Sequence, residues 1–79
     1  MRKPPTFEEW QVIIKNYLVK SLSYLTEGEI EEYLDKEKSY MHNEYNRDVK
    51  AYKSGEIGYG VITVGSPASV ADCLNMMYE

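Results

Sequence analysis

Apolar residues recur mostly at spacings of three and four from residue 7 to residue 25, which is the period of one face of an α-helix. The pattern predicts a helix over residues 7–25. Val12 and Val19 lie roughly opposite this face, since each residue turns the helix by about 100°. The predicted helix therefore has apolar side chains on two sides, and a second element must cover the side of the two valines. The main face consists of Phe7, Trp10, Ile14, Tyr17, Leu18 and Leu25.

Two predicted helix starts carry the same capping signal. Thr6 with Glu9, and Thr26 with Glu29, form Thr-x-x-Glu capping boxes. In such a box the threonine hydroxyl accepts from the third helical amide, and the glutamate accepts from the cap amide. The second box directly follows the first helix, so the connection between the two helices is very short. We expect the two helices to be neighbours in an antiparallel hairpin.

A second apolar stripe predicts one long helix over residues 27–54. It should end before Gly55, because glycine is favoured just past the end of a helix. Asn43 and Asn46 lie inside this helix, where their side chains compete with the backbone for hydrogen bonds, so a kink there would fit the pattern. The stripe consists of Ile30, Leu34, Met41, Tyr45 and Tyr52.

Residues 56–65 differ in character, because they combine glycines with a run of β-branched residues. This composition predicts an extended connector or a short strand, although the chain offers no second strand to pair with it. Ser66 and Pro67 then predict a third helix over residues 67–78, with the serine as its cap and the proline at its first helical position.

These elements together predict one all-α domain over residues 1–79, with a flexible N-terminus at residues 1–5. A capped antiparallel helical hairpin is joined through a glycine-containing extended connector to a short C-terminal helix. A domain of this size buries only about 60 to 65% of the surface of its unfolded chain. Association with a second copy would add stability, so we expect a homodimer, most commonly a twofold one.

Eight of the ten aromatic residues are tyrosines, and most of them recur at intervals of seven residues. A tyrosine ring gains from burial, whereas its hydroxyl needs a hydrogen-bond partner or water. This favours the rim of a core or a surface that binds a partner. The predicted function is therefore non-catalytic protein–protein interaction, chiefly of the chain with itself. The residues expected at the interface are Val12, Val19, Tyr33, Tyr40 and Tyr59.

The formal net charge of −4 and the pI of about 5.0 disfavour general attraction to nucleic acid or anionic lipid. Arg47, Lys50 and Lys53 nevertheless recur every third residue near the end of the second helix. Acidic residues crowd the start of that helix, so the two sets complement the helix macrodipole and need no ligand. The alternative function is a small accessory regulator that contacts nucleic acid through these three cations.

Few residues carry candidate chemistry. Glu37, Glu44 and Asp48 lie near the apolar face of the second helix and could hold a metal ion, but we expect them at its solvated edge. His42 is the only histidine, which is too few for a zinc site. A catalytic pair of His42 and Cys73 would need the two to meet in the fold. Cys73 lies on the apolar stripe of the third helix, where a free cysteine is usually buried. The sequence thus predicts no enzyme activity, cofactor or metal site.

The start of the chain is basic, and no apolar run of signal-peptide length follows it, which indicates that the protein is not secreted. Its longest apolar runs are much shorter than a membrane span. A single cysteine suits a reducing compartment. We therefore expect a cytoplasmic protein that does not contact a membrane.

Overall fold

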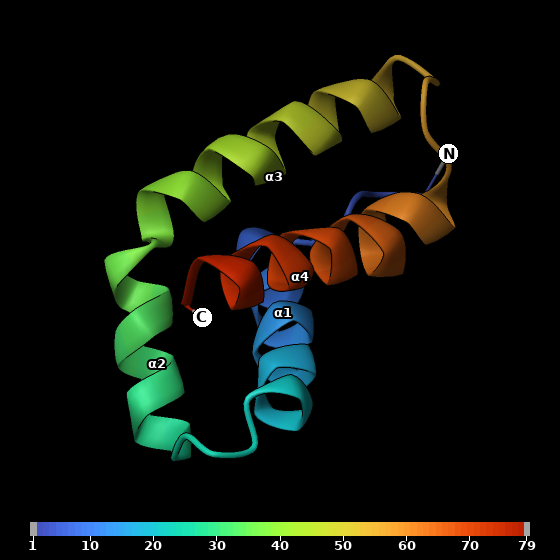
Figure 1. Cartoon of the computed structure of the whole chain (residues 1–79). Coiled ribbons are helices and arrows are strands. Elements are labelled where there is room, and N and C mark those ends of the chain that lie inside the picture. The colour runs from blue at the N-terminus through green and yellow to red at the C-terminus, as the bar shows by residue number, and fades with distance from the viewer. Residues whose placement is uncertain (1, 79) are drawn as a thin grey trace.

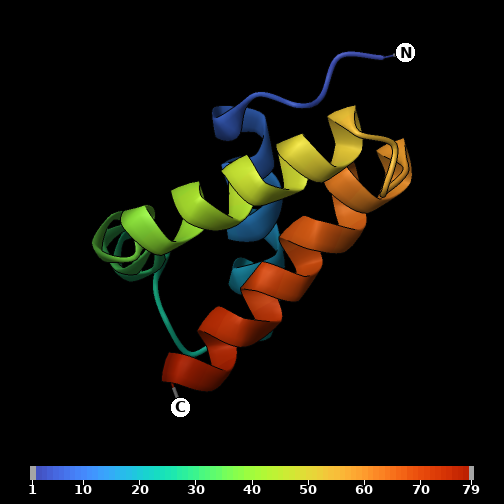
Figure 2. The ribbon, with the colours of Figure 1, turned by 90° about the horizontal axis from the view of Figure 1, so that it is seen from above.

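The computed structural model describes residues 2–78, and no strand occurs in this range. The prediction of an all-α fold is confirmed. α2 and α3 form an angle, and α4 crosses the space between them in front of α1 (Figure 1). Seen from above, α3 and α4 diverge from neighbouring ends and α1 passes beneath them (Figure 2). The elements are α1 (Phe7–Ser21), α2 (Glu27–Lys36), α3 (Lys38–Lys53), the π-helix η1 (Val61–Gly65) and α4 (Ser66–Tyr78).

Capping boxes start both α1 and α2. The backbone N–H of Glu9 donates to the Thr6 hydroxyl over 3.2 Å, and the Thr6 N–H donates to the Glu9 carboxylate over 2.9 Å. Thr26 and Glu29 form the same pair of bonds. α1 ends at Ser21, earlier than the expected residue 25, because the chain must leave the helix before Thr26 can cap α2.

The stretch expected to form one helix over residues 27–54 forms two helices. The chain bends at Glu37, whose backbone lies at φ −97° and ψ 15°. A straight helix of this length would extend about 40 Å and overhang the shorter α1. The bend instead lets Leu34 and Met41, which lie on either side of it, both reach the core. No break occurs at Asn43 or Asn46, which lie within α3 with exposed side chains.

The stretch expected to be an extended connector is partly helical. Gly60 already has helical angles, φ −63° and ψ −30°, and η1 leads directly into α4. Ser66 is helical too, so it does not act as the predicted cap. We attribute the π-helix to Pro67, because proline inside a helix lacks an amide donor and its ring collides with the carbonyl four residues earlier. The widened turn also keeps Ile62 completely buried.

The core lies where α1, α2, α3 and α4 meet, and α1 packs most extensively on α4. Trp10, Ile14 and Leu18 supply the α1 side of it and are fully buried. Phe7, Leu25, Tyr33, Tyr40 and Tyr45 are half-buried around its edge. The completely or nearly completely buried core residues are Trp10, Ile14, Leu18, Leu22, Ile30, Leu34, Met41, Val70, Ala71 and Leu74.

The N-terminal segment, expected to be flexible over residues 1–5, packs along α3 from residue 2 onward. The hydroxyl of Tyr45 donates to the carbonyl oxygen of Pro5, and the hydroxyl of Tyr52 donates to that of Arg2. Pro5 is buried. Met1 lies outside the described residues. The two hydrogen bonds place the segment along one side of α3, with Pro5 buried and Arg2 and Lys3 exposed.

Candidate protein interface

The two valines predicted at an interface lie in the open on α1. Val12 is 54% exposed and Val19 is 41% exposed, so no element within residues 2–78 buries them. α4 packs on another side of α1, where the Tyr17 hydroxyl donates to the Asp72 carboxylate over 2.5 Å. The apolar second side of α1, recognised from the sequence, therefore remains uncovered.

Beside Val12 lies a shallow hollow between α1 and α2, which we call the α1–α2 groove. Its volume is about 330 Å³. Leu34 is nearly completely buried, so the exposed apolar surface of the groove comes chiefly from Val12. The groove is lined by Glu8, Gln11, Val12, Lys15, Glu31, Leu34 and Asp35.

Negative charges outnumber positive charges in this groove. The Lys15 ammonium forms ion pairs with Glu27 at 3.0 Å and with Glu31 at 2.5 Å. The hydrogen bond to Glu31, with a further one to Glu27, raises the pKa of Lys15 and keeps it cationic. Glu8 and Asp35 form no ion pair with any residue between 2 and 78. The groove thus presents apolar atoms beside uncompensated negative charge.

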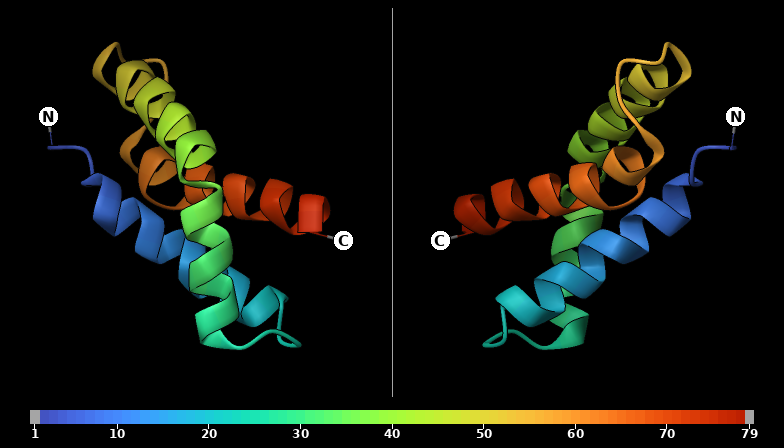
Figure 3. Two further views of the ribbon diagram at one scale, coloured as in Figure 1. Left: turned by 90° about the vertical axis from the view of Figure 1, so that its left-hand side faces the viewer. Right: turned by 90° about the vertical axis from the view of Figure 1, so that its right-hand side faces the viewer.

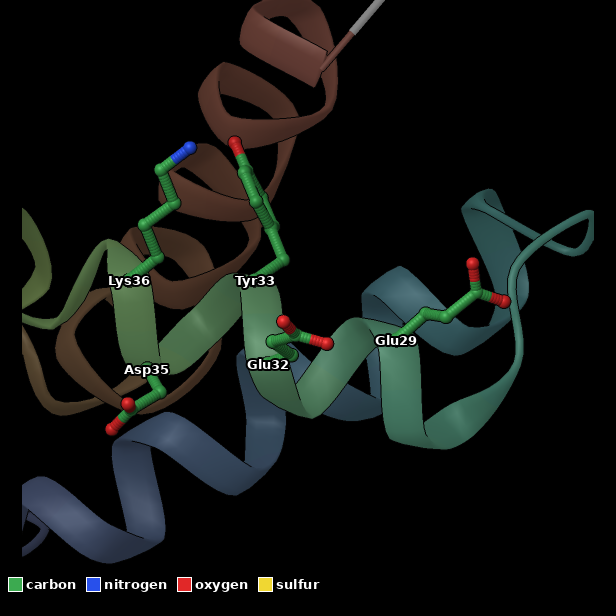
Figure 4. A pocket seen from close by; sticks show the side chains of 5 residues that line it. All are labelled: Glu29, Glu32, Tyr33, Asp35 and Lys36. Atoms are coloured by element: carbon green, nitrogen blue, oxygen red, sulfur yellow. The ribbon is translucent and has the colours of Figure 1, made fainter.

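A second hollow, of about 470 Å³, opens on α2. Figure 4 shows Tyr33 and Lys36 extending from α2 toward α4, whereas Asp35 points the opposite way. The Tyr33 hydroxyl donates to the carbonyl oxygen of Leu74 over 2.9 Å. The tyrosine therefore ties α2 to α4 instead of presenting a free hydroxyl to a partner. This hollow is lined by Glu29, Glu32, Tyr33, Asp35 and Lys36.

The two remaining tyrosines of the predicted interface lie elsewhere. Tyr40 is half-buried. Burial raises the pKa of Tyr40, and the nearby Cys73 and Glu44 add to that shift. Tyr59 is 37% exposed, and the guanidinium of Arg2 lies over its ring, 5.0 Å from the centroid. The five predicted residues thus fall into separate places, of which only α1 carries two neighbouring exposed members.

The three cations predicted to contact nucleic acid differ in whether they form ion pairs. Arg47 pairs with Glu44 and lies 4.0 Å from the Asp48 carboxylate. Lys50 and Lys53 are exposed and form no ion pair with the described part of the chain. The basic stripe inferred from spacing is therefore shorter than expected, because α3 supplies its own carboxylates to Arg47.

Other cations belong to the end of the molecule where the described start of the chain lies near the segment between α3 and η1 (Figure 1). Tyr52 holds the backbone of Arg2 there, and the rings of Tyr52 and Tyr59 lie 6.1 Å apart. Val61 and Val64, 45% and 62% exposed, follow on η1. We call this end of the molecule the basic end. It is defined by exposed residues from the start of the chain, the last turn of α3 and the segment that leads into and through η1, namely Arg2, Lys3, Lys50, Lys53, Tyr59, Val61 and Val64.

The candidate chemical residues stay apart. Cys73 is exposed, so the expectation that it is buried was wrong. The buried face of α4 runs through Val70 and Leu74 and leaves Cys73 at its edge. His42 stacks on the ring of Phe7 with 3.8 Å between centroids, whereas Cys73 interacts with Tyr40. Within residues 2–78 no three His, Cys, Asp or Glu side chains lie close enough together to hold a metal ion.

The roles of several residues on these surfaces could not be predicted from the sequence. Nothing in local spacing indicates that Lys15 pairs with Glu31, sixteen residues away. The β-branched composition around Val61 and Val64 predicts a strand, and it gives no sign that these two valines lie on a surface. A helical reading of that segment, with its valines three residues apart, would have identified an exposed apolar face.

No helix in the described part of the chain is long and apolar enough to cross a membrane. Comparison with known proteins brings no further guidance, since no family model, no curated protein and no solved structure matches this chain.

Proposed function

We propose that this chain is a non-catalytic protein–protein interaction module that associates with copies of itself through the exposed valines of α1 and the α1–α2 groove. The observation that carries the proposal is a contrast within one helix. Trp10, Ile14 and Leu18 are 0% exposed, whereas Val12 and Val19 are 54% and 41% exposed. Burying a valine completely contributes about 1.5 to 3 kcal/mol, so a partner that covered both would gain a useful part of that.

The size of the domain supports the same proposal. A chain of 79 residues has a small core, and core burial in such domains only just exceeds the conformational entropy of folding. A second copy that covers part of α1 would shift the folding equilibrium by mass action.

Sedimentation equilibrium tests the proposal. Measured at micromolar and roughly tenfold higher concentrations, the average mass should rise with concentration. Val19→Asp should abolish the rise while the helical circular dichroism signal stays, because a carboxylate resists burial but Val19 lies outside the core. Asn43→Asp adds the same charge at an exposed position of α3 that lies outside the groove and the basic end, and should associate like the wild type. A wild-type chain that keeps its monomer mass throughout would refute self-association.

A second candidate is contact with nucleic acid. It is favoured by the exposed Lys50 and Lys53 in the last turn of α3, the helix to which Tyr52 holds the backbone of Arg2. Cations on one surface bind phosphates in a strongly salt-dependent way. Binding to a duplex that weakens steeply with salt, and weakens further in a Lys50→Ala, Lys53→Ala variant, would support it. Absence of binding at low salt would exclude it.

A further inference from the structure

The groove that we propose as the site of self-association is unsuited to meeting its own copy. Glu8, Glu31 and Asp35 line it, and its single lysine is already engaged by Glu27 and Glu31. A twofold contact places the same patch of both copies face to face. Carboxylates on the rim would then oppose carboxylates, and such like-charge contacts across an interface are strongly unfavourable.

The basic end has the complementary character. It carries four cations, Arg2, Lys3, Lys50 and Lys53, against one nearby exposed carboxylate, Glu56. Its exposed apolar side chains include Val64 at 62% and Val61 at 45%. The basic end thus offers apolar side chains beside positive charge, where the groove offers them beside negative charge.

The two surfaces are formed by different elements. The groove lies between α1 and α2, whereas the basic end involves the last turn of α3 and the segment that leads into η1. Figure 3 shows these elements from two sides. The two surfaces share no residue, so one copy can present its basic end while its own groove stays open.

We propose that copies of this chain associate head to tail, with the basic end of one copy seated on the α1–α2 groove of the next. This inference rests on the proposed self-association and specifies its geometry. Val61 and Val64 cover Val12, and the lysines of the basic end face Glu8 and Asp35. The occupant of the groove is a second copy because charge and apolar surface on the same chain are complementary.

Head-to-tail contact has a consequence that a twofold dimer lacks. Each copy keeps one free groove or one free basic end, so the assembly grows beyond a dimer unless it closes into a ring. Opposite charges also attract across the contact, so added salt should weaken the association. In a twofold contact between acidic grooves, added salt would screen the repulsion and therefore strengthen the association.

A charge-swap experiment decides between the two geometries. The groove variant carries Glu8→Lys and Asp35→Lys, and the end variant carries Lys50→Glu and Lys53→Glu. Each variant alone should associate roughly tenfold or more weakly than the wild type, because each then opposes charges of the same sign. An equimolar mixture should recover association, because the basic end of the groove variant fits the acidic groove of the end variant, and the converse pair is also complementary.

The end variant gives the sharpest reading. A twofold groove contact does not involve Lys50 or Lys53, so an end variant that associates like the wild type would overturn the head-to-tail geometry and leave the proposed self-association intact. A wild-type chain that stays monomeric would refute both. The matched control, Lys20→Glu with Lys38→Glu, makes the same change in net charge outside both surfaces and should retain association.

Two further measurements show whether weaker association in a variant results from misfolding. The circular dichroism signal of each variant should match that of the wild type, and recovery in the mixture would itself require both chains to be folded. If either variant does not fold, the salt dependence of the wild type decides. Association that strengthens as salt rises would overturn the head-to-tail contact, and association that weakens supports it.

Discussion

The hydroxyl of Tyr45 donates a hydrogen bond to the carbonyl oxygen of Pro5, 2.6 Å away. Pro5 directly precedes the Thr6 cap, so this bond ties the middle of α3 to the start of α1. Seven residues further on, Tyr52 donates to the carbonyl of Arg2 over 2.8 Å. From the sequence, tyrosines at a spacing of seven are expected either at the rim of a core or at a partner surface. Here the spacing aligns two hydroxyls with the chain's own N-terminal segment.

Removing the Tyr45 hydroxyl should release this segment. In Tyr45→Phe the ring stays, but the half-buried Pro5 carbonyl loses its partner, which should lower the free energy of unfolding by about 1 kcal/mol. The urea midpoint measures the change. Tyr24→Phe is the control, because Tyr24 is 66% exposed and should tolerate the substitution. Equal midpoints for the two variants would mean that the bond to Pro5 contributes nothing.

Trp10 should be the most sensitive core position. It is completely buried, and its ring lies 5.6 Å from that of Tyr45 and 6.3 Å from that of Phe7. Trp10→Ala should lower the free energy of unfolding by about 3 to 5 kcal/mol, enough to unfold a domain whose stability lies at the low end of the usual range. Val12→Ala, at an exposed position on the same helix, should leave the circular dichroism signal unchanged.

Trp10→Phe provides a finer test. The indole N–H finds no hydrogen-bond partner within residues 2–78 although it is buried. Phenylalanine leaves a smaller ring but removes this unsatisfied donor, whose burial is unfavourable by about 1 to 3 kcal/mol. Trp10→Phe should therefore be far less destabilising than Trp10→Ala in urea unfolding. Similar losses for both variants would indicate that the N–H is satisfied in solution.

The starts of α1 and α2 could be predicted from the sequence because they depend on residues that are close together in the chain. Each capping box needs only a threonine and a glutamate three residues apart, so Thr6 and Thr26 could be identified without knowledge of the fold. The bend at Glu37 has no such signal, since no side chain caps the start of α3. It depends on Leu34 and Met41 both packing into one core, which is a tertiary constraint.

In the β-branched segment, residues 61–64, the intrinsic preference of the residues predicted the wrong secondary structure. Val61 to Val64 favour a strand by intrinsic propensity. Burial of Ile62, the continuous helix through Pro67 and the absence of any strand between residues 2 and 78 override that preference. For the site, the apolar side of Val12 and Val19 was visible from helical periodicity. The pairing of Lys15 with α2 was not, because it joins residues distant in the sequence.

Two glycines should respond in opposite ways to alanine. Gly55 follows the end of α3 with φ at 84°, the only positive φ among the described residues. Gly55→Ala should lower the free energy of unfolding by about 1 to 2 kcal/mol, because an L-residue is strained there. Gly60 is helical and an added methyl meets no atom within 4 Å, so Gly60→Ala should raise it by about 0.5 to 1 kcal/mol. Thermal unfolding of both variants measures these changes, and a stabilising Gly55→Ala would contradict the positive φ.

The hydrogen bond between Tyr17 and Asp72 should appear in alkaline titration. That bond raises the pKa of Tyr17, and the negative charge of Asp72 adds to the effect. Burial raises the pKa values of Tyr40 and Tyr45 in the same direction. A phenol whose pKa is higher in the folded state contributes stability that is complete below its unfolded pKa of about 10 and is lost as pH rises above it.

We therefore expect the free energy of unfolding to fall above about pH 10, and part of the tyrosine absorbance change to occur at higher pH than in the urea-unfolded chain. In Asp72→Asn the pKa of Tyr17 should return toward its ordinary value, because the substitution removes the charge that favours the protonated phenol. One tyrosine should then titrate earlier than in the wild type, and the alkaline loss of stability should be smaller. Folded and unfolded wild-type chains that titrate identically would show that Tyr17 is not held by Asp72 in solution.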